Sequence, residues 1–208
     1  MIDRFAKEME LYSRGAKCVV GVDEVGRGPL AGPVVAAAVW FEQSFTDDWW
    51  NSIRDSKKLS VLQREKLSEL ITQNSKTGIG IATVEEIEQL NILQASLVAM
   101  NRAVAPILSE FVNLEDGVVL VDGKFLIPNV LVAKQEAIIG GDGKVHSIAA
   151  ASIVAKVTRD NLMKQYAEQY PEYGFESHKG YGTAKHMDAI RAYGLTSIHR
   201  ASFCGKIL

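Results

Sequence analysis

Two adjacent carboxylates near the start of the chain have the residue types and the position that metal-dependent catalysis needs. Asp23 and Glu24 follow an apolar run over residues 18–22 that predicts a β-strand. Carboxylates at the end of a strand can hold a divalent cation. The turn Gly26-Arg27-Gly28 follows at once, and its glycines let the backbone approach a ligand closely. Because Arg27 can also bind a phosphate, this segment predicts chemistry on a substrate with a phosphate or ribose backbone.

Two further carboxylates, Asp122 and Asp160, are candidates for the same site. Asp122 ends a fully apolar run over residues 118–121, and Asp160 lies in a predicted helix on the apolar face of Val157 and Ile153. A carboxylate on such a face is unfavourable unless it is paired or bound to a metal. Neighbouring carboxylates repel one another, and a divalent cation removes that conflict. Ligands that are all oxygen favour Mg²⁺ or Mn²⁺ over Zn²⁺.

Each carboxylate also has a simpler explanation. These explanations are a turn at Asp122-Gly123 and at Asp142, capping groups at Asp23 and Glu24, and ion pairs of Asp160 with Lys156 or Lys164, one helical turn away. Asp142 lies between glycines and is interpreted as a turn residue. The joint occurrence of the other carboxylates beside the Gly-Arg-Gly turn favours a functional site.

Other kinds of active site find no support in the sequence. The histidines have no metal-binding spacing such as HExxH, and we interpret them as surface residues or phosphate contacts: His146, His178, His186 and His199. The sequence contains no GxSxG nucleophile motif and no P-loop, which argues against acyl transfer and nucleoside triphosphate hydrolysis.

Composition and charge describe an ordinary globular protein with basic regions. The 208 residues are 47% hydrophobic and 23% charged, with a net charge of −2. The two cysteines form no CxxC pair and the first residues are polar, so we expect a reducing compartment, the cytoplasm, and no membrane association. Basic residues predominate after residue 179 and again over 54–66. These regions are either solvated surface or the binding surface for an anionic partner.

The elements that must position the carboxylates follow from periodicity and capping signals. Apolar runs predict strands at 18–22, 34–41, 78–82 and 118–121, with a fifth beginning at 130–132. Capping boxes open helices at Ser60 and Thr83, the second carrying one apolar stripe from Leu90 to Val104. A helix of small residues runs from 148 past 164. This order predicts an α/β domain with a mixed central sheet, over residues 1–170, and a C-terminal helical extension, over 171–208, packed on it.

The motifs of this chain, taken together and in order, resemble those of bacterial ribonuclease HII. They are GVDEVGRGPLAGPVV at 21–35, DSKKLS at 55–60, LNIL at 90–93, LVDG at 120–123, IAAASIVAKVTRD at 148–160, YGF at 173–175, HKGYGT at 178–183 and HRASF at 199–203. Only 22 residues precede Asp23 and the Gly-Arg-Gly turn is intact, which favours ribonuclease HII over ribonuclease HIII.

The resemblance implies an RNase H-like fold and a role for each motif residue. The metal-site and catalytic carboxylates it implies are Asp23, Glu24, Asp122 and Asp160. The ribose-contacting residues it implies are Gly26, Arg27 and Gly28, with Tyr181 packing on the neighbouring sugar and Lys57 and Lys58 binding backbone phosphates. Gly140 and Ala201 stand where the family pattern has cations, which bears on affinity.

The resemblance also implies the reaction. A monomeric enzyme would use Mn²⁺ or Mg²⁺ to cut the RNA strand of RNA–DNA hybrids and to cut 5′ of single ribonucleotides embedded in duplex DNA. A 3′-hydroxyl and a 5′-phosphate would result. The alternatives are a catalytically inactive nucleic-acid-binding protein of the same fold, and a small phosphatase built on the same carboxylates, which the basic tail disfavours.

Overall fold

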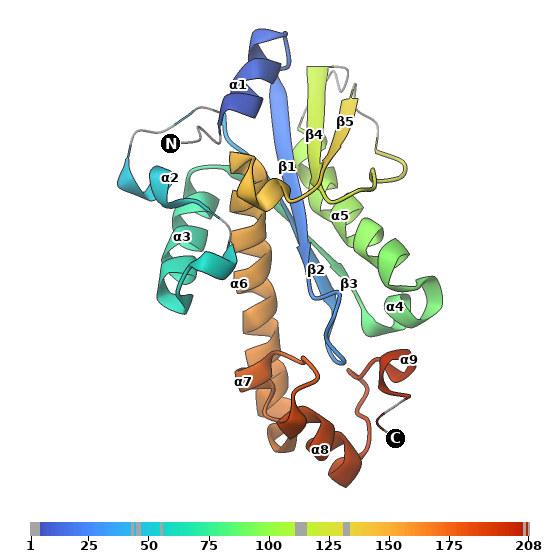
Figure 1. Cartoon of the computed structure of the whole chain (residues 1–208). Coiled ribbons are helices and arrows are strands. Elements are labelled where there is room, and N and C mark those ends of the chain that lie inside the picture. The colour runs from blue at the N-terminus through green and yellow to red at the C-terminus, as the bar shows by residue number, and fades with distance from the viewer. Residues whose placement is uncertain are drawn as a thin grey trace.

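A mixed five-stranded sheet forms the centre of the fold (Figure 1). The computed structural model describes residues 5–42, 44, 47–54, 56–110, 116–130, 134–205 and 207. The strands are β1 (Cys18–Val25), β2 (Val34–Trp40), β3 (Lys76–Ala82), β4 (Gly117–Asp122) and β5 (Lys134–Ile138), in the order β3-β2-β1-β4-β5. β1–β2 and β2–β3 are antiparallel, whereas β1–β4 and β4–β5 are parallel. The predicted α/β class with a mixed sheet is confirmed.

Helices cover both faces of this sheet. The α-helices are α1 (Ala6–Ser13), α2 (Asp48–Ser52), α3 (Val61–Gln73), α4 (Val84–Leu90), α5 (Ile92–Leu108), α6 (His146–Gln169), α7 (Phe175–His178), α8 (Ala184–Tyr193) and α9 (Ala201–Cys204). The 3₁₀ turns are η1 (Ser56–Lys58), η3 (Gly141–Gly143) and η4 (Pro171–Tyr173). Among the described residues, no helix is both long and apolar enough to span a lipid bilayer.

The alternation of side chains along β2 explains the two helical layers. Ala36 and Ala38 pack in one apolar cluster with α5, and Ala37 and Val39 pack in another with α6 and α3. These residues are small and wholly buried, so both helices lie close to the sheet. On β3, a Cβ added at Gly80 would collide with the carbonyl oxygen of Ala99 in α5.

The predicted helix from Thr83 to Val104 is wrong in one respect, because it is two helices. Thr83 forms the predicted capping box with Glu86 and begins α4. The chain then breaks at Asn91, which has φ 71° and caps α5 by accepting hydrogen bonds from the backbone of Leu93 and Gln94. Leu90 is consequently 40% exposed instead of lying on the apolar stripe. An asparagine that tolerates positive φ and also caps a helix explains the break.

The predicted fifth strand and the predicted long helix can each be compared with the structure. The fifth strand begins at Lys134, and of the three residues predicted to start it Val130 precedes the strand while Leu131 and Val132 lie outside the described residues. The helix predicted from 148 past 164 is confirmed as α6, which runs beyond the sheet (Figure 1).

The C-terminal elements pack around the far end of α6 and against the loop between β1 and β2. Met163 of α6 lies in an apolar cluster with Tyr173, Phe175 and Ile190. Three backbone hydrogen bonds tie this region to the loop: Leu30 N to Gly180 O, Gly32 N to Ile198 O and Arg200 N to Leu30 O, each 2.8 Å long. The loop that carries Gly26-Arg27-Gly28 is therefore held by residues near the other end of the chain.

Candidate active site

The strand pairing brings four carboxylates to one end of the sheet. The parallel pairing of β1 with β4 reaches Val22 opposite Val121, so Asp23 and Asp122 follow on neighbouring strands. Glu24 is the next residue of β1. Asp142 joins them from η3, because the backbone N–H of Gly141 donates a 2.6 Å hydrogen bond to Asp122 Oδ1.

Burial and mutual repulsion oppose ionisation of these carboxylates. Burial raises the pKa of Asp23 well above its usual range, and the charges of Glu24 and Asp122 raise it further. Burial likewise raises the pKa of Glu24, against the opposing effect of Arg27. The pKa of Asp122 is raised by burial and, less strongly, by the charge of Asp142. Carboxylates in this environment are stabilised by a nearby cation.

Asp23, Glu24 and Asp142 each have a side-chain partner that restrains them. Asp23 accepts hydrogen bonds from the backbone N–H of Glu24, at 2.7 Å, and from the Ser152 hydroxyl of α6. Arg27 Nη1 lies 3.2 Å from Glu24 Oε1. Lys57 Nζ lies 3.3 Å from Asp142 Oδ2, which connects η1 to the cluster. Two of the predicted cationic residues are thus already beside the acidic ones.

The donor set fits a divalent cation that keeps part of its water shell. All the candidate ligand atoms are oxygens, and Glu24 Oε2 is buried without a hydrogen-bond partner among the described residues. In the described part of the chain, no three Asp, Glu, His or Cys side chains converge closely enough to form a complete metal cage. Mg²⁺ commonly binds through one or two carboxylates together with waters and substrate phosphates, so an incomplete cage suits it.

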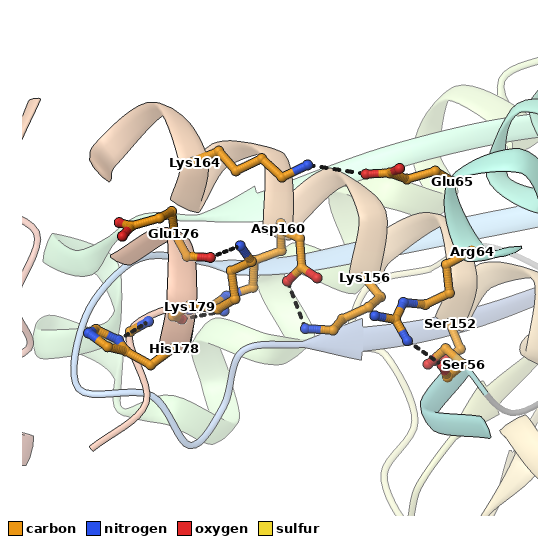
Figure 2. Close-up of polar contacts among 12 residues, drawn as sticks. Ser56, Arg64, Glu65, Ser152, Lys156, Asp160, Lys164, Glu176, His178 and Lys179 are labelled. Atoms are coloured by element: carbon orange, nitrogen blue, oxygen red, sulfur yellow. Dashed lines mark hydrogen bonds and ion pairs between the residues drawn. The ribbon is translucent and has the colours of Figure 1, made fainter. Parts of the chain in front are cut away.

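Asp160, predicted to be the fourth carboxylate, is placed elsewhere. Its Oδ1 accepts a 2.7 Å hydrogen bond from Lys156 Nζ, the ion pair that the sequence offered as its alternative (Figure 2). Ser152, which contacts Asp23, lies eight residues earlier in α6, or about 12 Å along the helix axis at 1.5 Å per residue. Figure 2 shows Asp160 among side chains of a second polar cluster, which includes the Lys164–Glu65 pair.

Asp160 lies away from the other carboxylates because α6 continues past the sheet. The helical face that is fully buried at Ile153 is only half-buried at Val157 and Asp160. Periodicity identifies that face but does not show where the sheet beneath it ends. Asp142 could have been found by extending the rule used for Asp122, since it follows the strand next to β4.

The predicted ribose-contacting residues lie together next to the carboxylates. A Cβ added at Gly28 would lie 3.8 Å from Cε1 of Tyr181, so the tyrosine ring lies beside this exposed glycine. Tyr181 is 44% exposed, and the Arg27 side chain is also largely accessible. Lys57 and Lys58 are exposed on η1. The structure thus brings together residues 26–28 and Tyr181, which the sequence separates widely.

Two arginines hold the loop in place. Arg159 and Arg200 are both 0% exposed. Arg200 donates hydrogen bonds to the carbonyl oxygens of Gly26, Arg27 and Gly32. Arg159 donates to those of Ala31, Pro33 and Lys179. Arg200 belongs to the basic region after residue 179, which was predicted to be surface. It is instead a buried structural residue.

Comparisons with known proteins identify the family of this chain. The family model described as Ribonuclease HII matches residues 20–206. The chain belongs to the ribonuclease HII family. The ribonuclease HII of Fusobacterium nucleatum subsp. nucleatum is 52% identical over 199 residues, which cover 95% of this chain and 91% of that protein. The ribonuclease H2 structure from Pyrococcus horikoshii OT3 is 27% identical, with a TM-score of 0.69 over 91% of this chain and 96% of that one.

A third relative shares the fold at lower identity. Bst-RNase HIII, solved in complex with Mn²⁺, is 16% identical with a TM-score of 0.74, over 95% of this chain and 71% of that one. The predicted RNase H-like fold is confirmed by the ribonuclease H2 likeness. As a member of the ribonuclease HII family, the chain is a metal-dependent endoribonuclease that acts on RNA–DNA hybrids.

Proposed function

We propose that this ribonuclease HII cuts the RNA strand of RNA–DNA hybrids and also cuts duplex DNA on the 5′ side of a single embedded ribonucleotide. The observation that carries the proposal is the continuity of β1 with the Gly26-Arg27-Gly28 turn. It places the carboxylates Asp23 and Glu24 within a few residues of the surface formed by Gly28 and Tyr181. A fixed spacing between reacting groups and recognition surface gives a fixed cleavage position.

The proposed metal-binding residues are Asp23, Glu24, Asp122 and Asp142. Asp142 replaces Asp160 in this set, because Asp142 adjoins Asp122 and Lys57 whereas Asp160 is paired with Lys156. Two divalent cations, Mg²⁺ or Mn²⁺, would supply Lewis-acid stabilisation of an in-line phosphoryl transfer when bound. The carboxylates supply negative charge and orientation. Water as the attacking group gives a 3′-hydroxyl and a 5′-phosphate.

The proposed recognition of ribose depends on Gly28 and Tyr181. The 2′-hydroxyl is the group that distinguishes RNA from DNA at one position. The loop backbone at Gly28 carries no side chain that would keep a sugar away, and the Tyr181 ring beside it offers an apolar face to the neighbouring sugar. Arg27, Lys57 and Lys58 are accessible cations for the backbone phosphates.

The test is the cleavage of a duplex with one ribonucleotide. We expect a single cut on the 5′ side in the presence of Mg²⁺ or Mn²⁺, with a 3′-hydroxyl on the upstream fragment. An all-DNA duplex of the same sequence is the control and should remain intact. A cut on the 3′ side, or a cyclic phosphate end, would contradict water as the attacking group. Binding without any cut would favour the alternative of an inactive nucleic-acid-binding protein.

We also propose that the enzyme works as a monomer in the cytoplasm, with residues 171–208 as an extension of the catalytic domain. Both cysteines are free and buried, which supports a reducing compartment. Sedimentation velocity at micromolar concentration tests the monomer, and a dimer would contradict it.

A further inference from the structure

Three histidines of the C-terminal region have no role in the function proposed so far. His178 ends α7, His186 lies in α8 and His199 precedes α9. The sequence suggested surface positions or phosphate contacts for them, and this is wrong, because all three are buried. Their rings lie against one another, with His178 and His186 stacked at 4.5 Å between centroids and an interplanar angle of 14°.

The hydrogen bonds of two of these rings fix where each proton lies. The backbone N–H of Thr196 donates to His199 Nδ1 at 2.9 Å, and a backbone N–H can only donate. A neutral His199 therefore carries its proton on Nε2, which donates to His186 Nε2 at 3.1 Å. His186 must then carry its proton on Nδ1, which donates to the carbonyl oxygen of Tyr181 at 2.9 Å. These hydrogen bonds therefore form a chain of donors and acceptors that runs in one direction, from Thr196 through His199 and His186 to Tyr181.

His178, the third histidine, holds the backbone of Gly180, the residue before Tyr181, through hydrogen bonds of its own. The backbone N–H of Gly180 donates to His178 Nδ1 at 3.2 Å. The His178 Nε2–H then donates to the carbonyl oxygen of Tyr173 at 2.8 Å. Two neighbouring backbone groups, Gly180 N–H and Tyr181 C=O, are thus bound by neutral imidazoles.

The buried environment keeps the imidazoles of this hydrogen-bond chain neutral. Burial is the main reason that the pKa of His186 is lowered and that of His199 is lowered to about 4. The rings are packed with Phe175, whose centroid lies 5.3 Å from that of His186 and 5.7 Å from that of His199. A protonated ring would point an N–H at another N–H and break the chain.

His186 is one of several groups that fix the Tyr181 backbone. The Tyr181 N–H donates to His178 O at 3.0 Å, and the Tyr181 carbonyl oxygen also accepts from Thr183 N–H at 2.8 Å. His186 adds the side-chain donor to that carbonyl oxygen.

Tyr181 is 44% exposed and lies in a turn after Gly180, which has φ +84°. The same turn accepts the hydrogen bond from Leu30 N to Gly180 O, so it also contacts the loop that carries Gly28. The direction of the Tyr181 backbone therefore affects whether its ring lies beside Gly28.

We propose that His186 and His199 are positioning residues for Tyr181, and that through it they set how strongly the enzyme favours a ribonucleotide junction. The inference rests on the proposed function, in which Tyr181 contacts a sugar. His186 acts directly through its Nδ1–H, whereas His199 acts by holding His186 in that tautomer. Neither side chain touches the substrate.

Two substitutions of His186 distinguish the effect of its hydrogen bond to Tyr181 from the effect of its packing. In His186→Asn, the amide N–H stands near the former Nδ1 and keeps the donor to Tyr181. In His186→Gln, the amide reaches the former Nε2 and keeps the partner of His199, but no donor faces Tyr181. Both variants lose the imidazole ring, so we expect similar losses of thermal stability.

The readouts are kcat/KM on a duplex with one ribonucleotide and Kd for an all-DNA duplex. We expect His186→Gln to lower kcat/KM about tenfold, the factor of one lost hydrogen bond, and His186→Asn to remain within about twofold of wild type. Kd for plain DNA should be unchanged in both. In a Tyr181→Ala background, His186→Gln should have no further effect on kcat/KM. Equal losses in the Gln and Asn variants, or additive losses with Tyr181→Ala, would overturn the inference.

A second measurement does not depend on cleavage. Nitrogen-15 NMR of the histidine side chains in the wild-type chain at neutral pH should show His199 protonated at Nε2 and His186 at Nδ1. The opposite tautomers would overturn the inference even if the substituted proteins fail to fold. If the tautomers are found but wild type does not cut at a ribonucleotide, the proposed function fails and the hydrogen-bond chain stands.

Discussion

Replacing one carboxylate at a time by its amide tests which carboxylates take part in cleavage, those around Asp122 or the separate Asp160. We expect Asp142→Asn and Asp122→Asn to lower kcat more than about a hundredfold, since even the loss of a residue that only supports a metal ligand costs about ten- to a hundredfold. Asp160→Asn breaks the ion pair with Lys156 and should leave kcat within about threefold, because Asp160 lies about 12 Å along α6 from Ser152, which contacts Asp23. Single-turnover cleavage at saturating metal measures all three. A large loss in Asp160→Asn alone would restore the sequence-based assignment.

The buried charge of Asp23 has a cost that can be measured without substrate. Its pKa is raised by burial, so ionisation of this carboxyl destabilises the fold in the absence of metal. Asp23→Asn keeps the oxygen that accepts from the Glu24 backbone, so we expect Tm with EDTA to rise by about 2–4 °C. Mn²⁺ should raise Tm of wild type more than that of the variant.

The control for this experiment is Asp188→Asn. Asp188 is exposed and pairs with Arg191, so its substitution should leave Tm and the response to Mn²⁺ unchanged. A fall in Tm for Asp23→Asn would show that the carboxylate itself is needed for folding.

At the scale of elements, the geometry of the β1–β2 loop depends on two buried arginines and on a glycine. Gly26 has φ +97°, and a Cβ there would collide with Arg159 Nε. Gly15 has φ +101°, yet nothing lies within 4 Å of an added Cβ. Alanine costs about 1–2 kcal/mol of backbone strain at either position, but only Gly26→Ala also displaces Arg159.

We therefore expect Gly26→Ala to lose both stability and cleavage, and Gly15→Ala to lose some stability only. Urea unfolding and kcat/KM, measured on the two variants in parallel, check this expectation. Comparable activity losses in both would mean that strain, not the displacement of Arg159, is the cause.

The elements also show how far the sequence predicts this fold. The four apolar strands and both capping boxes were predictable, because local periodicity and local hydrogen bonds produce them. Asp23, Glu24 and Asp122 were predictable as neighbours because they lie at the ends of apolar strands, β1 and β4. The break at Asn91 was not, since it depends on one residue adopting positive φ. Asp142 was interpreted as a turn residue because the end of the fifth strand was not predicted, so the strand-end rule was not extended to it. Its closeness to Asp122 is then fixed by the hydrogen bond through Gly141.

For the whole molecule, the buried histidines predict a loss of stability in acid. The pKa of His199 is lowered from 6.5 to about 4, mainly by burial and then by His186. Between these pH values the unfolded chain binds a proton that the folded chain does not, so the free energy of unfolding decreases as pH falls through this window. Chemical unfolding followed across the window measures the slope.

His199→Asn provides the comparison for this slope. The asparagine oxygen can accept from Thr196 N–H as Nδ1 does, but it does not titrate here. We expect this variant to be less stable at neutral pH and to show a shallower decrease in acid. An unchanged slope would assign the acid sensitivity to other groups.

The hydrogen bond from Arg200 to the carbonyl of Gly26 spans 174 positions of the chain. Protein synthesis proceeds from the N-terminus at about 5–20 residues per second, so β1 is made long before the residue that secures the loop after it. A nascent chain can pair its strands and bury its apolar faces while this loop lacks its arginine. The geometry of this loop therefore cannot be completed before Arg200 is made, and a chain whose synthesis stalls earlier would lack the proposed recognition surface.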